Sequence, residues 1–500
     1  MPGMDRALYT DFMDSPVFQQ YVSGSWHQGN GETRPVVTPQ TGETIAGVAV
    51  GTLADAQTAL AESYRIFTDR EEFRSQSAAD RYVILRGIEA GLVARREEFA
   101  RGITLESGKT IRDARGEVDR GLLVLSLAAE EARRFGGDVL PLDINEASRG
   151  RIGLTRRFPV GTVAALTPFN FPLNLLLHKV APAIAVGNPV IVKPSERTPL
   201  TALRLAELVH SVCGDTNHPS QGAFSVLTPR EPKAVAELLA TDPRAPVLSF
   251  TGSDTVGWHL KSLANKKRVT LELGGNAAVI VCGDADVYQI VRRCVWGAFA
   301  NAGQVCISVQ RIFVDRKIFD RFVEEFIHAT GRLVIGNPMN EDTDLGPMIT
   351  PQARDNALKL VEEAESQGAT TLLRGETSGY AHLSPTVLTD TKPEMRVRST
   401  EAFAPLVCIE PFDSLADALA LANEGRYGLQ TGIFTQNIGQ IFAAWNTLDV
   451  GAVIANDVPQ YRVDSMPYGG ERDSGFGREG IRYAIEEMTA LRLLALNLQP

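Results

Sequence analysis

The sequence predicts an α/β protein with largely parallel sheets, on two observations. Short runs rich in Val and Ile alternate along the chain with amphipathic segments whose apolar residues recur at i, i+3 and i+4. Gly and Pro mark the boundaries between the two kinds of segment. At 500 residues, the chain should also divide into about three or four units of ordinary domain size.

The strand–helix alternation is clearest from residue 158 to about 260, which is typical of a doubly wound nucleotide-binding sheet. Strands are expected there at 161–166, 189–193, 222–227 and 246–250, with helices at 198–213 and 232–240. Upstream, apolar periodicity predicts helices at 53–63, 78–104 and 112–134. A second α/β block begins near residue 275, with strands expected at 277–282 and 308–314 and helices at 287–302 and 319–327.

Three segments need a separate interpretation. Residues 171–194 are apolar, but His178, Lys179 and several prolines interrupt them, so they predict a buried helix and strand rather than a membrane span. Residues 138–157 and 490–498 alternate apolar and polar residues and predict exposed strands. The free edges of such strands either pair with a strand of a second copy of the chain or are covered within the monomer, and the sequence leaves both possibilities open.

The charge balance excludes several classes of partner. Fifty Lys and Arg stand against 60 Asp and Glu, giving a net charge of −10, whereas nucleic-acid binders carry basic patches. The same balance disfavours anionic membranes. Five scattered cysteines without a CxxC pair indicate neither a disulfide framework nor a metal site. With no secretory pattern at the start, a reducing, cytoplasmic location is expected.

Three residues are the strongest candidates for chemistry. Cys306 lies on a predicted loop between a helix and a strand, where a thiol can be displayed, although an isolated cysteine is more often a buried apolar residue. Glu272 interrupts an apolar run, which favours either a base with a raised pKa or a charge on an exposed strand face. Asn170 follows a strand between aromatic and proline residues and suits either an oxyanion donor or a turn.

Two loops favour nucleotide binding. Residues 252–257 follow a strand and open a helix, a geometry that directs backbone N–H groups at a phosphate. Their glycine spacing is that of a P-loop, but Trp258 and His259 replace the required Lys and Ser or Thr, so ATP or GTP hydrolysis is not expected. Lys193 and Glu196 follow another strand. The Glu196 carboxylate would accept hydrogen bonds from ribose hydroxyls and repel a 2′-phosphate, or it would complement a helix N-terminus.

Together and in this order, these features resemble the NAD(P)-dependent aldehyde dehydrogenase family over nearly the whole chain, from about residue 20. The nearest branch handles lactaldehyde, phosphonoacetaldehyde and similar small polar aldehydes. The motifs that carry the resemblance are Pro168-Phe169-Asn170-Phe171-Pro172, Lys193-Pro194-Ser195-Glu196, Phe250-Thr251-Gly252-Ser253, Leu271-Glu272-Leu273-Gly274-Gly275, Gly303-Gln304-Val305-Cys306, Glu401-Ala402-Phe403-Ala404-Pro405 and Pro467-Tyr468-Gly469-Gly470.

The resemblance implies a reaction and the residues that perform it. Cys306 would attack the aldehyde carbon, and Asn170 with the Cys306 backbone N–H would hold the oxyanion. Hydride transfer to the nicotinamide would leave a thioester, and Glu272 would activate the water that releases a free carboxylate. Relatives that acylate coenzyme A lack this base, so we expect a hydrolytic enzyme. No metal is expected.

The resemblance also implies a cofactor site and an architecture. NAD is expected, and NADP is the less favoured alternative because of Glu196. The expected cofactor-binding residues are Lys193, Glu196, Ser253, Gly252, Glu401, Phe403, Thr167 and Phe169. The family has a Rossmann-like cofactor domain, expected at residues 1–137 and 158–274, and an α/β catalytic domain, expected at 275–470. A small β oligomerisation flap is expected at 138–157 and 488–500, and it implies a homodimer or homotetramer.

The expected substrate is a small polar or anionic aldehyde. Arg115 and Arg462 are candidates for holding its anionic or hydroxylated tail, or else they form ordinary salt bridges. Val305 and Ile307 flank the nucleophile and favour a compact substrate. The alternatives are a semialdehyde or an aliphatic aldehyde in the same reaction, a thiol hydrolase, and a catalytically silent binding or structural protein on the same scaffold.

Overall fold

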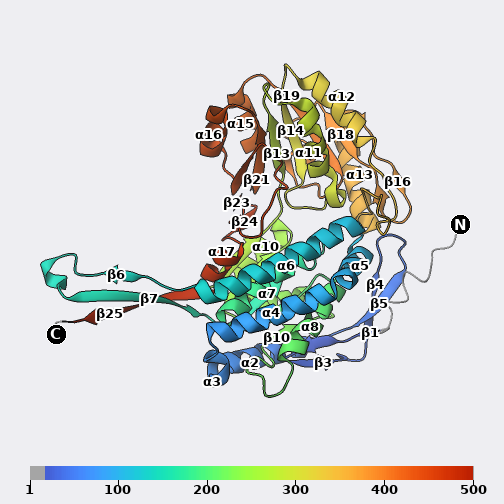
Figure 1. Ribbon diagram of the computed structural model, residues 1–500. Coiled ribbons are helices and arrows are strands. Elements are labelled where there is room, and N and C mark those ends of the chain that lie inside the picture. The colour runs from blue at the N-terminus through green and yellow to red at the C-terminus, as the bar shows by residue number, and fades with distance from the viewer. Residues whose placement is uncertain (1–16, 499–500) are drawn as a thin grey trace.

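The computed structural model describes residues 17–498, which form two α/β halves and a projecting arm (Figure 1). We call the part built on an eight-stranded sheet the first half and the part built on a seven-stranded sheet the second half. The arm is a three-stranded sheet of β6 (Val139–Pro141), β7 (Arg151–Pro159) and β25 (Thr489–Asn497). The predicted α/β class is confirmed.

The first half has the strand order β24-β12-β11-β8-β9-β10-β2-β3, and its five central strands are parallel. The strands are β2 (Gln20–Val22), β3 (Ser25–His27), β8 (Val163–Leu166), β9 (Val190–Lys193), β10 (Phe224–Val226), β11 (Val247–Thr251), β12 (Arg268–Glu272) and β24 (Gly475–Phe476). Its helices are α2 (Leu53–Asp69), α4 (Ala78–Ala94), α5 (Arg96–Ser107), α6 (Ile111–Arg134), α7 (Asn174–Val186), α8 (Leu200–Cys213), α9 (Pro232–Thr241), α10 (Asp254–Leu263) and α17 (Ile481–Glu487).

The second half has the strand order β15-β18-β19-β14-β13-β21-β22, parallel except between β15 and β18. The strands are β13 (Ala277–Val281), β14 (Val309–Asp315), β15 (Thr370–Leu373), β18 (Thr386–Thr389), β19 (Leu406–Phe412), β21 (Gln430–Phe434) and β22 (Ala452–Ala455). The main helices are α11 (Val287–Phe299), α12 (Phe319–Thr330), α13 (Pro351–Ser366), α15 (Leu415–Asn423) and α16 (Ile438–Thr447).

Three expected helices differ from those observed. The helix expected at 78–104 is two helices, α4 and α5, because Arg95 leaves helical geometry with φ −110° and ψ 21°. The helix expected at 287–302 ends at Phe299, since Asn301 and Ala302 adopt positive φ angles of 51° and 55° in a short turn. The helix expected at 53–63 continues to Asp69 as α2.

The predicted exposed strands are confirmed, and they pair with each other. β7 runs antiparallel to β25 along its whole length, from the pair of Pro159 with Thr489 to the pair of Arg151 with Asn497. Within the described residues the outer edges of β6 and β25 have no partner strand. Leu491, on β25, is more than half exposed, as are Leu493 and Leu494. The arm therefore presents apolar surface and free strand edges.

The apolar segment 171–194 is buried inside the first half, as predicted. It forms α7 and β9, and nearly all side chains of α7 are buried, Lys179 included. No helix between residues 17 and 498 has the length and apolar character to cross a bilayer.

Parallel strands gather the loops of the first half at one sheet edge. β8, β9, β11 and β12 end at Leu166, Lys193, Thr251 and Glu272, and ligands of open α/β sheets bind beyond such carboxyl ends. The loops that carry Asn170, Glu196, Gly252 and Glu272 therefore meet on the side that faces the second half.

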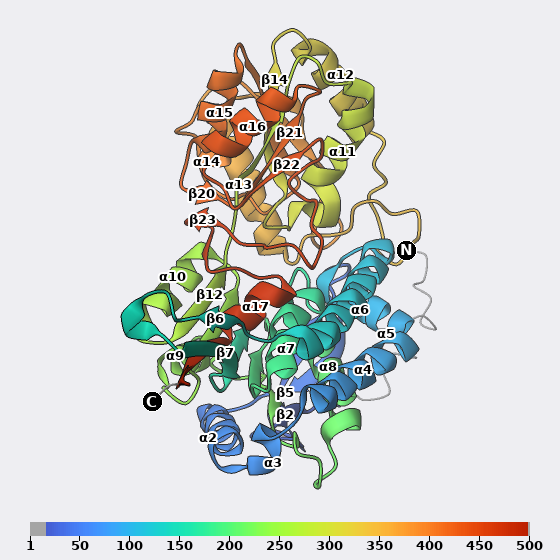
Figure 2. The same cartoon turned by 60° about the vertical axis from the view of Figure 1, so that its left-hand side comes forward.

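The chain returns to the first half after it has built the second. Residues 471–487, which the expected domain boundaries leave unassigned, hold β24 and α17. β24 pairs antiparallel with β12, and α17 lies against α7 (Figure 2). The segment that leads back, around residues 460–470, therefore crosses the junction of the two halves.

Glu106, near the end of α5, ties the helices of the first half together. Its fully buried carboxylate accepts hydrogen bonds from the backbone N–H groups of Leu200 (2.8 Å) and Thr201 (3.0 Å), at the start of α8. α8 has no side-chain cap of its own. Burial raises the pKa of Glu106 to about 7 despite these hydrogen bonds.

Replacing Glu106 should destabilise the protein. Glu106→Ala leaves two buried N–H donors without an acceptor, at about 1–3 kcal/mol each, so we expect the free energy of unfolding to fall by about 3 kcal/mol. Chemical denaturation followed by circular dichroism measures this. Glu130→Ala, which removes an exposed carboxylate from α6, is the control and should change stability by less than about 0.5 kcal/mol. Equal stability of the two variants would contradict the capping role.

Candidate active site

A cavity of about 320 Å³ lies where the loop at 460–468 and α11 of the second half meet α6 and α7 of the first. Apolar and aromatic side chains, among them Phe171, Trp296 and Tyr468, form much of its wall. Cys306 lines it, together with Val305 and Ile307 on either side. Largely apolar cavities with a few convergent polar groups are the usual form of small-molecule sites.

The Cys306 loop is held in one conformation. Gly303 has a φ of 70°, and a Cβ atom there would lie 2.0 Å from the Ala404 carbonyl oxygen, so the turn requires glycine. Cys306 Sγ lies 3.0 Å from Tyr468 Oη. Burial raises the pKa of the Cys306 thiol to about 11, whereas the hydrogen bond with Tyr468 and the charge of Arg462 lower it.

The remaining cysteines have no access to this cavity. Cys213, Cys282, Cys294 and Cys408 are buried, and burial raises the pKa of each thiol. Cys306 is therefore the one cysteine among residues 17–498 that can meet a substrate.

Asn170 lies beside the nucleophile loop. Its side-chain Nδ2 donates a hydrogen bond of 2.9 Å to the Gln304 carbonyl, two residues before Cys306, and the side chain is buried. This contact joins the loop after β8 in the first half to the loop before β14 in the second. A rigid amide at this place can donate its second N–H to an oxyanion formed on Cys306.

Glu272 is a buried carboxylate without a hydrogen-bond partner. It ends β12 with 3% exposure, so the alternative of a charge on an exposed strand face is wrong. Neither carboxylate oxygen is hydrogen-bonded. Burial and the negative charge of Glu479 raise its pKa well above the ordinary value, while Arg462 and Lys179 act in the opposite direction. A free carboxylate of raised pKa has the properties of a general base.

Other predicted cofactor residues lie along the same sheet edge. Lys193 Nζ and Glu196 Oε1 form an ion pair of 2.5 Å after β9, and the Thr167 backbone N–H donates to the Lys193 carbonyl (3.2 Å). Gly252 and Ser253 precede α10, and the Ser253 side chain caps none of its N–H groups. This donor set fits a dinucleotide, because a carboxylate can accept from ribose hydroxyls and an uncapped helix start can donate to phosphate.

Two more predicted cofactor residues come from the second half. Glu401 Oε1 accepts a hydrogen bond from the Gly275 N–H (2.9 Å), and burial raises the pKa of Glu401 to about 7. Phe403 has a positive φ of 47°, and its ring packs edge-on against Phe169 with 5.9 Å between centroids. Glu401 and Phe403 line a small space together with Gly303 and Val305 of the Cys306 loop.

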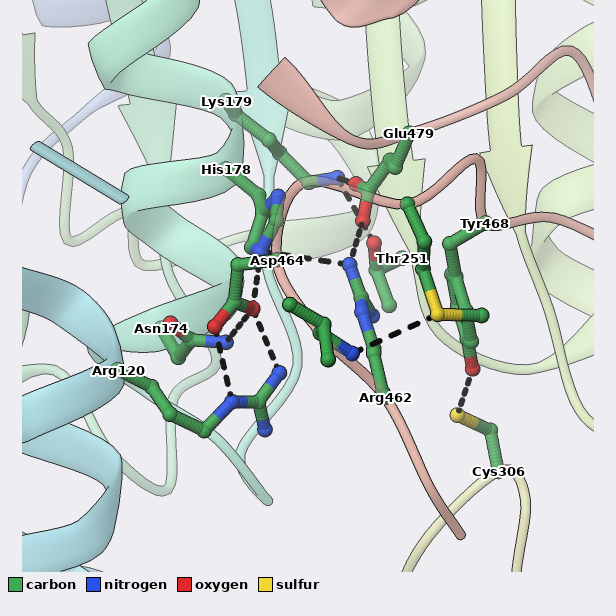
Figure 3. Close-up of polar contacts among 12 residues, drawn as sticks. Arg120, Asn174, His178, Lys179, Thr251, Cys306, Arg462, Asp464, Tyr468 and Glu479 are labelled. Atoms are coloured by element: carbon green, nitrogen blue, oxygen red, sulfur yellow. Dashed lines mark hydrogen bonds and ion pairs between the residues drawn. The ribbon is translucent and has the colours of Figure 1, made fainter. Parts of the chain in front are cut away.

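The structure also contains a buried ionic network that sequence reasoning did not find (Figure 3). Asp464 accepts two hydrogen bonds from Arg120 (2.7 and 3.1 Å), one from Asn174 (3.2 Å), and pairs with His178 Nε2 (2.8 Å). Burial alone would raise the pKa of Asp464, but His178 and Arg120 hold it well below its usual range. Burial and Arg462 lower the pKa of His178, so the imidazole is neutral at pH 7.

The network continues to Glu479, which contacts Lys179 Nζ (2.6 Å) and Arg462 Nη2 (3.3 Å). Burial opposes ionisation of Glu479, but Lys179 and the neighbouring cations lower its pKa to about 2. Lys179 also donates to Thr251 at the end of β11 (2.8 Å). The network thus connects Arg120 and Arg462, which line the cavity, with Glu479, whose negative charge raises the pKa of Glu272.

The two predicted anion-binding arginines lie in different places. Arg462 lines the cavity, and its guanidinium carbon lies 3.7 Å from the centre of the Tyr468 ring. Arg115 is not among the lining residues, because its guanidinium forms ion pairs with Glu97 (2.8 Å) and Glu341 (2.7 Å). Arg120, which was not predicted, lines the cavity instead. Its signal in the sequence is a row of polar residues at helical spacing, Lys109, Asp113, Glu117 and Arg120.

No cluster of three or more His, Cys, Asp or Glu side chains in the described chain could hold a metal ion. A parallel nucleotide-type sheet that faces a cysteine-lined cavity suits an oxidoreductase that binds a dinucleotide.

Comparison with known proteins agrees with this class. The aldehyde dehydrogenase family profile matches residues 26–494. The 3-sulfolactaldehyde dehydrogenase of Priestia megaterium is 41% identical over 478 residues, 96% of this chain and 98% of its own. The lactaldehyde dehydrogenase of Methanococcus vannielii is 36% identical over 95% of this chain and 99% of its own. The structure of aldehyde dehydrogenase 21 from Physcomitrella patens, in complex with the reaction product succinate, is similar with a TM-score of 0.92 and 38% sequence identity. The match covers 97% of this chain and 99% of that one.

The chain belongs to the aldehyde dehydrogenase family and is an enzyme. The resemblance seen in the sequence is confirmed, and the similarity to lactaldehyde and sulfolactaldehyde dehydrogenases confirms the branch.

Removing the Tyr468 hydroxyl should make Cys306 less reactive. The hydrogen bond lowers the pKa of the thiol, so Tyr468→Phe raises that pKa and reduces the thiolate fraction at any pH below it. We expect alkylation of Cys306 by iodoacetamide at pH 8 to slow by about 3- to 10-fold, with the rate–pH curve moved to higher pH. Tyr288→Phe, on the exposed side of α11, is the control. An unchanged alkylation rate in Tyr468→Phe would show that the contact does not act on the thiol.

Proposed function

We propose that this protein oxidises a small polar or anionic aldehyde to the free carboxylate with NAD, through a thiohemiacetal and a thioester on Cys306. The observation that supports the proposal is the thiol of Cys306 in a cavity lined by several cations, with the buried amide of Asn170 bound to its loop and the unpartnered buried carboxylate of Glu272 close enough to act on its pKa.

Each of the three residues has a distinct task. The Cys306 thiolate attacks the aldehyde carbon, and the Asn170 amide with the Cys306 backbone N–H holds the resulting oxyanion. Bound NAD supplies the acceptor for the hydride that leaves the tetrahedral carbon. Glu272, whose pKa is raised by burial and by the charge of Glu479, then takes a proton from the water that cleaves the thioester.

NAD is favoured over NADP because of Glu196. Its carboxylate, fixed by Lys193, is about one-third exposed at the end of β9. It would accept hydrogen bonds from an adenosine ribose and would repel a 2′-phosphate at the same place. Lys193, Gly252, Ser253, Glu401, Phe403, Thr167 and Phe169 would hold the remainder of the cofactor.

The charges around the cavity favour a substrate with an anionic group. Five cations, Lys109, Arg112, Arg120, Arg293 and Arg462, line it against two acids, Asp113 and Glu117. Arg120 uses Nε and Nη2 on Asp464, which leaves Nη1 free for a ligand. An arginine fixed in this way loses little side-chain entropy when it binds an anion. Sulfolactaldehyde, an anionic semialdehyde or a hydroxylated small aldehyde would each fit this description.

We further propose a homo-oligomer in a reducing compartment such as the cytoplasm. The free edge of β25 with its exposed leucines supports pairing with a second copy, as does the edge strand β22 beside the exposed Phe442 and Trp445 of α16. All five cysteines are free, and oxidation of Cys306 would stop turnover.

The role of Glu272 can be tested by its amide. Glu272→Gln keeps the size of the side chain but removes the base, so we expect one burst of NADH per active site followed by turnover slowed about 10²–10⁴-fold. Mass spectrometry of the quenched enzyme should detect the thioester on Cys306. Glu410→Gln, a buried carboxylate of β19 outside the cavity, is the matched control and should turn over normally. Slow turnover without a burst or an acyl-enzyme would contradict a role in hydrolysis.

The substrate class can be tested through Arg120. Arg120→Gln should lower kcat/KM for an anionic aldehyde such as succinate semialdehyde about 10–100-fold more than kcat/KM for a neutral aldehyde, because a charge-assisted contact is worth about 1.5–3 kcal/mol. Arg133→Gln, exposed on the same helix, is the control. If wild type shows no preference for anionic aldehydes in a panel assayed with NAD and NADP, the proposed substrate class is wrong.

A further inference from the structure

A second, larger hollow adjoins the mouth of the active-site cavity. This outer cavity, of about 610 Å³, lies between the start of α6, α11 and the end of α12. It shares Arg112, Asp113, Trp296 and Ala300 with the active-site cavity, so the two spaces are neighbours with a common wall. A ligand that approaches Cys306 from this side passes through it.

Two arginines of the outer cavity have no acidic partner among the described residues. Arg292 lies on α11 and Arg332 follows α12, both are exposed, and neither guanidinium forms an ion pair or a side-chain hydrogen bond. The third arginine of the outer cavity, Arg112, forms an ion pair with Asp344 (2.9 Å). Apart from Asp344, the only acid that lines the outer cavity is Asp113.

This local charge is opposite to that of the whole molecule. The chain carries a net charge of −10 and repels anions at long range, whereas the two cavities together are lined by seven cations and three acids, Arg112 and Asp113 being shared. A hollow in which one sign of charge predominates raises the local concentration of the opposite charge. Unpaired guanidinium groups are suited to carboxylate, sulfonate or phosphonate oxygens.

We propose that the outer cavity is a capture site for the anionic group of incoming aldehydes, with Arg292 and Arg332 as the residues that determine the preference for a negative charge. The inference rests on the proposed function, since it concerns anionic substrates of the same reaction. The anion first pairs with Arg292 and Arg332 and then exchanges to Arg120 and Arg462 as the carbonyl reaches Cys306. Arg292 and Arg332 do not touch the reacting atoms, so kcat does not depend on them.

The test compares two double variants with the same change in net charge. Arg292→Gln/Arg332→Gln removes the capture charges, and Arg74→Gln/Lys233→Gln removes two exposed charges on α3 (Glu71–Arg74) and α9, outside both cavities. At an ionic strength of about 10 mM, the first variant should show kcat/KM for an anionic aldehyde reduced about 5- to 10-fold, with kcat and the neutral aldehyde unchanged. At about 500 mM it should converge with wild type, because salt screens the interaction.

A second measurement separates this inference from the substrate class. Inorganic sulfate is used as an inhibitor of neutral-aldehyde oxidation, so the result does not require that any anionic aldehyde be a substrate. We expect the inhibition constant for sulfate at low ionic strength to rise about 5-fold in Arg292→Gln/Arg332→Gln and to stay the same in the control. An unchanged inhibition constant together with an unchanged kcat/KM would overturn the capture site, as would equal effects in both double variants or equal loss for neutral and anionic aldehydes.

Discussion

The active site depends on a set of buried charges that join the two halves of the protein. Asp464 and Glu479 come from the last part of the chain, and their charged partners Arg120 and Lys179 lie on α6 and α7 of the first half. Removing one member of such a set leaves an uncompensated buried charge, at a cost of about 3–5 kcal/mol. The network therefore fixes the loop at 460–468 against the first half with little freedom to slide.

The position of this loop determines the environment of both Cys306 and Glu272. Tyr468, at its end, contacts the Cys306 thiol, and Tyr468 pairs through backbone hydrogen bonds of 3.0 and 2.7 Å with Glu479. A Cβ atom on Gly469 would lie 3.2 Å from a carboxylate oxygen of Glu272, so the base packs directly against the same turn. Cys306 and Glu272 thus pack against the same turn, and the charge of Arg462 lowers the pKa of both.

The sequence predicted the parts of the site that depend on short local motifs. Cys306, Glu272 and Asn170 lie within motifs of a few residues at strand ends, where parallel topology brings loops together. The pair of Arg120 with Asp464 spans 344 residues, and its formation depends on the rotation of α6 and the path of a distant loop. Arg115 and Arg120 lie five residues apart on one helix, about 140° around its axis, and only the structure distinguishes the face that meets the cavity.

The late return of the chain to the first half has a consequence for truncated forms of the protein. A chain cut before residue 460 lacks the carboxylates of Asp464 and Glu479, as well as the strand that covers the edge of β12. Arg120 and Lys179 then have no counter-ions, and the sheet of the first half has an open edge. The surroundings of Cys306 and Glu272 therefore depend on residues that lie far from both along the chain.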